Sequence, residues 1–244
     1  MEEICRGIYI VLGYNLIIIA RDLSKLEELK AELEQNNKKQ EIIIIAKDLS
    51  SKENCIEIYN QTKNIELDLL VNNAGFGTFG EFSKTDLEKE INLINTNITA
   101  VHILTKLYLQ DMLKRNKGHI LNVASIAGMQ PGPLMASYYA SKSYVIRLSI
   151  AINKEIKKGK TKVKISILCP GPVNTNFNNI ANVVFKAPSM SSEKVAKYGI
   201  NKTLKGKLII VPGFLNKCVR FSSKIIPDFI LEEVAYHIQR RKRK

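Results

Sequence analysis

The sequence predicts an α/β protein built on a doubly wound parallel sheet with helices on both faces. Three observations indicate this fold class. Short runs of β-branched apolar residues recur along the chain, segments of helical length separate most of them, and 45% of the 244 residues are hydrophobic. A chain of this size and composition supports a buried core, which excludes a disordered or fibrous protein.

The apolar runs are continuous rather than alternating, as in strands that are buried on both faces of a parallel sheet. We expect strands at 16–20, 41–46, 67–71, 119–123, 163–168 and 207–211. Helical patterns occupy 23–35, with Asp22 as the expected N-cap, and 86–115, 138–158 and 192–205. Strands that alternate with helices in this way form right-handed βαβ units.

We expect a single domain over residues 1–244, in which 212–244 is a basic, partly apolar C-terminal extension. The formal net charge of +14 is concentrated in two stretches. Residues 201–244 contain eleven basic and three acidic residues, and 154–164 contain six lysines and one glutamate. The remainder is nearly neutral and carries no nucleic-acid motif, so we predict no nucleic-acid partner. Peripheral membrane contact through the C-terminus stays open, as does packing of its apolar residues against the domain or a second subunit.

The cysteines and histidines indicate a reduced protein without a metal site. The four cysteines are widely separated, and no histidine lies at metal-site spacing. The first residues lack the basic region of a signal peptide, and the apolar run 8–20 is too short to span a bilayer. We therefore expect a cytoplasmic protein.

Polar residues follow the expected strands at their carboxyl ends, where open α/β sheets bind ligands. They lie in three turns, which in chain order contain Asn72, Asn73, Ala74 and Gly75, then Ser125, and finally Pro170, Gly171, Val173 and Thr175. Tyr138 comes thirteen residues after Ser125 and is followed one helical turn later by Lys142. These groups are predicted to meet at one edge of the sheet.

The Tyr-x-x-x-Lys spacing carries little information by itself, because the chain contains three such pairs. They are Tyr59 with Lys63, Tyr138 with Lys142, and Tyr198 with Lys202. Of the three tyrosines, only Tyr138 has a serine thirteen residues upstream, on a turn that follows a strand. The other two pairs are interpreted as surface residues at helical spacing.

These residues follow one another along the chain in a characteristic order: Asn72–Asn73–Ala74–Gly75, Asn97, Ser125, Tyr138, Lys142 and the Pro170–Gly171 turn. In this order the chain resembles the short-chain dehydrogenase/reductase family. The resemblance covers nearly the whole chain and implies a single-domain, Rossmann-like NAD(P)-dependent oxidoreductase. Such an enzyme transfers a hydride between nicotinamide and a carbonyl or secondary alcohol. The resemblance also implies a homodimer or homotetramer.

The resemblance assigns a role to each catalytic candidate. Tyr138 is expected to act as general acid/base, with its pKa lowered by Lys142, which also reaches the cofactor ribose. Ser125 is expected to hydrogen-bond the substrate oxygen, and Asn97 to hold a water in the proton relay.

Cofactor choice depends on the end of the run 16–20, which continues as Arg21 and Asp22. Arginine pairs with the 2′-phosphate of NADP, whereas an acidic residue would accept the ribose hydroxyls of NAD. We therefore predict NADP in preference to NAD. Asp48 resembles the adenine contact of the family, and Val173 and Thr175 the contacts to the nicotinamide amide. The segments between Ser125 and Tyr138 and after Thr175 are apolar, which suits a hydrophobic ketone as substrate. The alternative that these side chains pack a lid without a ligand stays open.

The sequence departs from the family at its start. The family begins with a strand and a glycine-rich turn that approaches the cofactor pyrophosphate, whereas residues 2–12 read as the helix that follows this turn. The missing strand would lie between 16–20 and 67–71. Two accounts stay open: a working reductase whose sequence is given from an internal methionine, or a degenerate relative without cofactor binding that acts as an interaction protein or is inactive.

Overall fold

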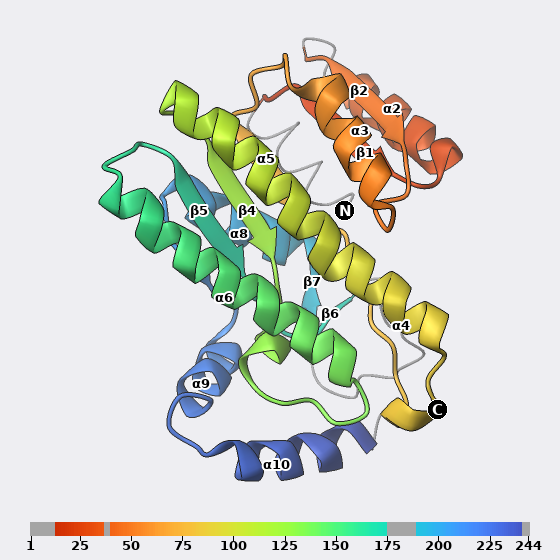
Figure 1. Cartoon of the computed structure of the whole chain (residues 1–244), viewed down its shortest axis with the longest axis vertical. Helices are drawn as coiled ribbons and strands as arrows, with labels where there is room; N and C mark the ends of the chain where they lie inside the picture. Colours follow the sequence, from red (N-terminus) through yellow and green to blue (C-terminus); the bar gives the residue numbers. More distant parts are fainter. Residues whose placement is uncertain (1–12, 37–39, 175–188, 241–244) are drawn as a thin grey trace.

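The computed structural model describes residues 13–36, 40–174 and 189–240 and shows an α/β fold (Figure 1). Four parallel strands form one sheet, in the order β3 (Leu69–Asn72), β4 (His119–Val123), β5 (Lys164–Leu168) and β8 (Ile209–Ile210). A second parallel sheet pairs β1 (Leu16–Ala20) with β2 (Ile42–Ala46), and a third pairs β6 (Val173–Asn174) with β7 (Met190–Ser191). The six predicted strands are confirmed.

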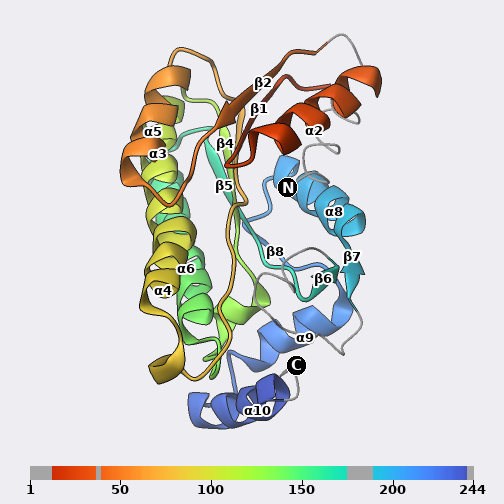
Figure 2. The same cartoon turned by 90° about the vertical axis from the view of Figure 1, so that its right-hand side faces the viewer.

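Helices cover both faces, as the doubly wound fold requires (Figure 2). One layer contains α3 (Lys52–Thr62), α4 (Leu87–Ile94), α5 (Ala100–Arg115) and α6 (Ala136–Lys158), and the other contains α2 (Leu23–Asn36) and α8 (Ser192–Leu204). Two further helices, α9 (Phe214–Ser222) and α10 (Asp228–Arg240), lie together at the lower end in Figures 1 and 2.

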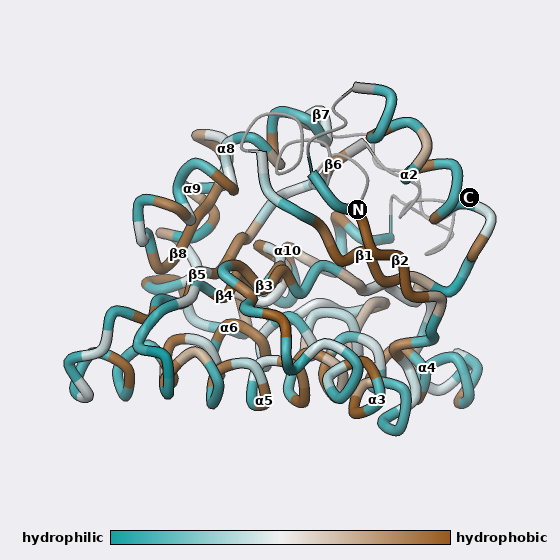
Figure 3. The backbone as a smooth tube through the Cα atoms, turned by 90° about the horizontal axis from the view of Figure 1, so that it is seen from above, coloured by the Kyte–Doolittle hydropathy of each residue, from teal (hydrophilic) through white to brown (hydrophobic). Residues whose placement is uncertain are grey.

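The core explains why the strand runs are continuously apolar. Ile120 and Ile165 pack with residues of α5 and α6, whereas Leu121 and Leu168 pack with Val195 of α8. Successive residues of a strand point to opposite faces, so both faces of β4 and β5 are buried. Viewed from above, β1 and β2 are likewise coloured as hydrophobic (Figure 3).

A chain of polar side chains crosses this core and fixes the end of β3. The Asn122 side chain is fully buried; its Nδ2 donates to Ser149 Oγ (2.9 Å), and its Oδ1 accepts from Asn72 Nδ2 (2.8 Å). Thr105 Oγ1 accepts from Asn72 Nδ2 (3.0 Å) and donates to Asn122 Oδ1. Each member is buried and hydrogen-bonded, so the network fixes the turn that follows Asn72 relative to α5 and α6.

The four-stranded sheet and the sheet of β1 and β2 do not pair with each other in the described residues: β1 pairs with β2, and β3 pairs with β4. A cavity of about 520 Å³ lies between the facing edges of β1 and β3. This is the place at which the sequence predicted a missing strand. The predicted helix 2–12 lies outside the described residues.

Some helices differ from the predictions. The segment 86–115 is not one α-helix, because the five residues Asn95–Thr99 form a π-helix between α4 and α5. Helices α3, α9 and α10 were not predicted. The N-cap of α2 was predicted correctly, since Asp22 Oδ1 accepts from the backbone N–H of Lys25 (3.2 Å).

Among the helices of the described residues, none is both long and apolar enough to cross a membrane.

Candidate active site

The turns after β4 and β5 are joined at the carboxyl edge of the sheet. The backbone N–H of Ala124 donates to the Leu168 carbonyl (2.8 Å), and that of Ile126 donates to the Pro170 carbonyl (3.0 Å). These bonds continue the strand pairing past the end of β4. They bring Ser125 beside the Pro170 turn, as expected for groups that follow neighbouring parallel strands.

The Ser125 hydroxyl is held in place by its surroundings. Its Oγ accepts from the backbone N–H of Ala127 (3.1 Å), which caps the 3₁₀-helix Ile126–Met129, and donates to the Pro170 carbonyl (3.3 Å). Gly128 lets this short helix approach α6, because a Cβ at this position would come within 2.5 Å of the Lys142 carbonyl carbon. The close approach brings the side chains of Ser125 and Tyr138 into hydrogen-bonding contact.

Tyr138 and Lys142 lie one turn apart at the start of α6, as the sequence predicts. Lys142 is 5% exposed, and its Nζ donates to the carbonyl of Val123 (3.0 Å) at the end of β4. The same Nζ lies 5.9 Å from the centre of the Tyr138 ring. A phenol, a hydroxyl and a buried amine therefore converge on one edge of the sheet.

Burial governs the protonation of both groups. It raises the pKa of Tyr138 to about 12, and the hydrogen bond to Ser125 offsets this only in part. Burial lowers the pKa of Lys142 to about 8. The expected lowering of the Tyr138 pKa by Lys142 is therefore not found, because burial of the phenol has the largest effect on this pKa and the hydrogen bond to Ser125 is the effect that lowers it.

Asn97 lies in the π-helix and is fully buried. Its Oδ1 accepts from the Phe76 N–H (3.0 Å), and its Nδ2 donates to the Phe76 carbonyl (2.9 Å) and to Ser141 Oγ (3.0 Å). The side chain thus fastens the turn after β3 to α6. A Cβ on Gly75 would lie 2.9 Å from Asn97 Oδ1 and 3.1 Å from Lys142 Nζ, so this turn reaches the catalytic candidates.

The other cofactor candidates lie along the same edge. Arg21 directly follows β1, and its guanidinium lies 3.7 Å from a carboxylate oxygen of Asp48, which follows β2. This ion pair was not predicted. Asn73 and Ala74 line the cavity beside β3, and Val173 begins β6. Thr175 lies outside the described residues.

Two contacts from the C-terminal helices reach the site, and sequence reasoning missed both. Asn216 of α9 packs so closely on Gly171 that a Cβ there would collide with its amide. Gln239 of α10 donates to the hydroxyl of Tyr139, the neighbour of Tyr138. Gln239 is buried on one face of α10 together with Leu231 and Ala235, which precede it at intervals of four residues. This spacing could have indicated that α10 docks on the domain through that face.

A parallel α/β sheet with this serine, tyrosine and lysine at its carboxyl edge has the architecture of an α/β dehydrogenase. The sequence model of the short chain dehydrogenases matches residues 2–183, and the chain belongs to this family.

Known proteins agree with this assignment. The chain is 33% identical to rat 17-beta-hydroxysteroid dehydrogenase type 3 over 174 residues, which cover 70% of the chain and 55% of the relative. It is 33% identical to the very-long-chain 3-oxoacyl-CoA reductase of Anas platyrhynchos, over 72% of the chain and 57% of the relative. The chain therefore spans little more than half the length of these two relatives.

Solved structures show the same fold. A 7beta-hydroxysteroid dehydrogenase superimposes with a TM-score of 0.82 at 19% identity, over 97% of this chain and 91% of that one. A short-chain dehydrogenase from Sphingobium yanoikuyae in complex with NADPH superimposes with a TM-score of 0.80 at 21% identity, over 92% and 91%.

Proposed function

We propose that this protein transfers a hydride between NADP(H) and a carbonyl or secondary alcohol. The observation that carries the proposal is the convergence of Ser125, Tyr138 and Lys142 at the carboxyl edge of the sheet. Bound nicotinamide would supply or accept the hydride. The carbonyl oxygen then gains negative charge and needs both a hydrogen-bond donor and a proton.

The three side chains match these needs. The Tyr138 phenol supplies the proton to the forming alkoxide. Ser125 turns its hydroxyl proton from the Pro170 carbonyl to the same oxygen, while the Ala127 N–H holds the Ser125 oxygen in position. Lys142 is the cation beside the phenol, and with a pKa of about 8 it is protonated near neutrality. Protonated Lys142 opposes the effect of burial on the phenolate.

Substitution of Tyr138 tests this role. Tyr138→Phe removes the proton donor but keeps the ring, so turnover should fall by about 10²–10⁴-fold with an unchanged far-UV circular dichroism spectrum. Tyr144→Phe is the matched control on the same helix, because Tyr144 instead pairs with His102 (2.7 Å). Equal turnover in the Tyr138→Phe protein and the parent would remove Tyr138 from the mechanism.

The residues at the carboxyl edge fit a dinucleotide. Gly75 lets the turn after β3 approach Asn97 and Lys142 more closely than a residue with a Cβ could, and Arg21 is an exposed cation at the end of β1. Arg21 would hold the 2′-phosphate of NADP after exchanging its Asp48 partner for it. Arg21→Ala should therefore raise the Kd for NADPH about tenfold with little effect on that for NADH, as measured by calorimetry. Equal changes for both cofactors would contradict this role.

An apolar carbonyl compound is the substrate class that the surroundings favour. Phe79, Met135 and Tyr139 pack together beside Tyr138, and the Gly80 N–H donates to the Leu134 carbonyl (2.9 Å). The named relatives act on steroid and long-chain 3-oxoacyl substrates, which supports the same class. NADPH oxidation should thus be faster with a ketosteroid or a long-chain 3-oxoacyl thioester than with acetone. Preference for acetone would contradict an apolar pocket.

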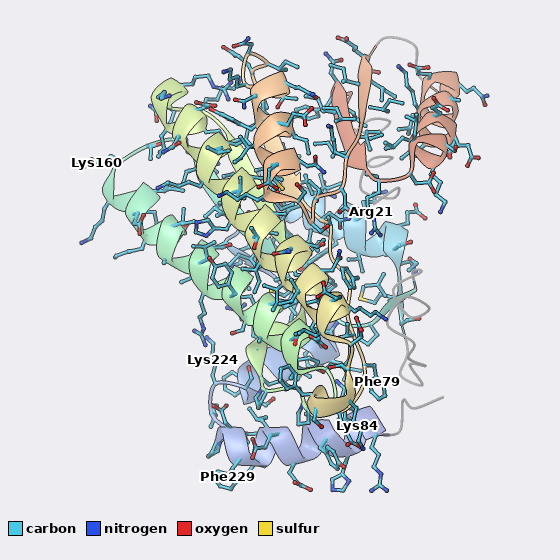
Figure 4. The ribbon with its side chains drawn as sticks, turned by 45° about the vertical axis from the view of Figure 1, so that its right-hand side comes forward. Arg21, Phe79, Lys84, Lys160, Lys224 and Phe229 are labelled. Atoms are coloured by element: carbon cyan, nitrogen blue, oxygen red, sulfur yellow. The ribbon has the colours of Figure 1, made fainter. Side chains whose placement is uncertain are left out.

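We also propose a cytoplasmic homo-oligomer whose α9 docks on an anionic membrane. Phe214 and Phe221 on α9 are 77% and 67% exposed, with Lys217 and Lys224 beside them. Figure 4 shows Lys224 and Phe229 on the outside of the lower end of the molecule.

Light scattering would report the oligomeric state, and a monomer would contradict the proposed homo-oligomer.

Sedimentation with vesicles that contain phosphatidylserine tests the membrane contact. The variant with Phe214→Ser and Phe221→Ser should bind at least tenfold more weakly than the parent, whereas Leu87→Ser, at an apolar position that is 69% exposed on α4, should bind normally. Equal losses in both variants would contradict docking through α9.

A further inference from the structure

Helix α10 docks on the protein through a polar side chain as well as apolar ones. Leu231 and Ala235 are 7% and 2% exposed on its buried face, and Gln239, one further turn along the same face, is 1% exposed. Burial of an amide is unfavourable unless the amide is hydrogen-bonded. Figure 1 shows α10 below the loop that leads into α6. The buried amide therefore lies between the C-terminal helix and the candidate active site.

The Gln239 amide is only half satisfied. Its Nε2 donates to the hydroxyl of Tyr139, whereas its Oε1 is buried and has no hydrogen-bond partner in the part of the chain that the structure describes. Burial raises the pKa of Tyr139 to about 12, so this hydroxyl stays protonated near neutrality. An apolar side chain would fill the same place without an unpaired oxygen. The hydrogen bond to Tyr139 is the interaction that only the polar residue supplies.

The Tyr139 ring lies against the loop 130–135. A Cβ at Gly132 would collide with the ring, so the backbone of the loop rests directly on it. The ring centres of Tyr138 and Tyr139 are 6.1 Å apart in an edge-to-face contact, and both rings pack on Met135. In a closely packed cluster of this kind, displacement of one ring moves its neighbours. The position of Tyr139 therefore bears on the loop and on the surroundings of Tyr138.

This loop holds a backbone conformation that needs support. Leu134 has a φ of 65°, in the left-handed region that is unfavourable for leucine. Its carbonyl accepts from the Gly80 N–H (2.9 Å), and the Met135 N–H donates to the Gly132 carbonyl (3.1 Å). A residue in such a conformation persists only where its surroundings determine it. The Tyr139 ring against Gly132 is part of these surroundings.

We propose that Gln239 is a positioning residue, which through Tyr139 fixes the loop 130–135 and so sets the size of the carbonyl compound that the site accepts. The end of this loop packs beside Tyr138, whereas the contacts that hold Ser125 do not involve it. A loosened loop should therefore weaken the binding of bulky substrates that reach it more than that of small ones. The link to substrate size rests on the proposed hydride transfer, whereas the positioning of the loop does not.

Amide hydrogen exchange of the full chain without cofactor or substrate, followed by NMR, tests the positioning. In the Gln239→Leu variant, exchange at Gly80 and Met135, whose N–H groups hold the loop, should be about tenfold faster than in the parent. Exchange at Ile126, whose N–H bonds to the turn after β5, should stay the same. Glu232→Leu, at an exposed position of α10, is the matched control and should leave all three rates unchanged.

Steady-state kinetics test the link to substrate size. In Gln239→Leu the KM for a ketosteroid should rise about tenfold, and the ratio of kcat/KM for the ketosteroid to that for acetone should fall by a similar factor. Tyr139→Phe removes the other half of the hydrogen bond and should have the same effect. The double variant should show no further loss, because both substitutions remove one interaction.

Exchange at Gly80 and Met135 that Gln239→Leu leaves unchanged would overturn the proposal. So would an equal fall of kcat/KM for both substrates, since this indicates a general loss of folded protein, and so would additive effects of the two substitutions. If the parent reduces no carbonyl compound, the proposed hydride transfer fails instead, and the exchange rates still decide whether Gln239 positions the loop.

Discussion

Replacement of the buried lysine should make the protein more stable and inactive at the same time. Lys142 is 5% exposed, and its Nζ contacts the carbonyl of Val123. Its pKa falls from 10.5 to about 8. At about 1.4 kcal/mol for each unit, holding this charge at pH 7 costs the folded state about 3 kcal/mol. The variant also loses the hydrogen bond to Val123, which lowers its stability by about 1 kcal/mol. Lys142→Met should therefore raise the free energy of unfolding by about 2 kcal/mol.

The pH dependence separates this cause from a change in packing. Between pH 8 and pH 10.5 the unfolded chain still binds the proton that folded Lys142 has released. The stability of the parent therefore rises with pH in this window, and the advantage of the Lys142→Met variant shrinks. The opposite effect of Tyr138, whose pKa is raised to about 12, begins above pH 10 and is common to both proteins.

Urea unfolding at pH 7, 9 and 10 would measure this difference, with far-UV circular dichroism as the signal because the chain contains no tryptophan. Lys106→Met, at an exposed position on α5, is the control and should change stability by less than about 0.5 kcal/mol. A variant at Lys142 that is less stable than the parent at pH 7, or an advantage that is the same at pH 7 and pH 10, would refute the argument.

Three further predictions concern the scaffold of the site. Gly128→Ala should lower stability by about 3 kcal/mol in urea, because its Cβ meets the backbone of Lys142, whereas Gly159→Ala, with no atom closer than 3.5 Å, should be neutral or slightly stabilising. Asn122→Ala should cost about 3 kcal/mol in the same assay, since it leaves buried partners unpaired. Burial lowers the pKa of His119 to about 4. As the pH is lowered from 6.5 to 4, only the unfolded chain gains the proton, so the free energy of unfolding should fall, and His119→Gln should flatten this pH profile.

The sequence predicted the strands and the site better than the helices that support them. The strand runs 119–123 and 163–168 are apolar on both faces, a pattern that burial in a parallel sheet leaves in any sequence. Ser125, Tyr138 and Lys142 could be placed because each follows a strand or lies one helical turn from its neighbour.

The rest depends on tertiary packing. No local pattern shows that Asn216 and Gln239 return to the site from the C-terminal helices, because these contacts join residues far apart in the chain. The π-helix at Asn97 has no signal in hydrophobic periodicity. The raised pKa of Tyr138 was also missed, since a charge partner at helical spacing can be read from a sequence whereas the depth of burial cannot.

The buried network of Asn72, Thr105, Asn122 and Ser149 has a consequence for how this chain can change over time. Replacing one member by an apolar residue leaves its partners without hydrogen bonds, whereas replacing all four together could restore an ordinary apolar core. Single mutational steps between these two solutions pass through unstable proteins. We therefore expect these four positions to covary as a unit among related sequences, with the identity of each constrained by the other three rather than by the reaction.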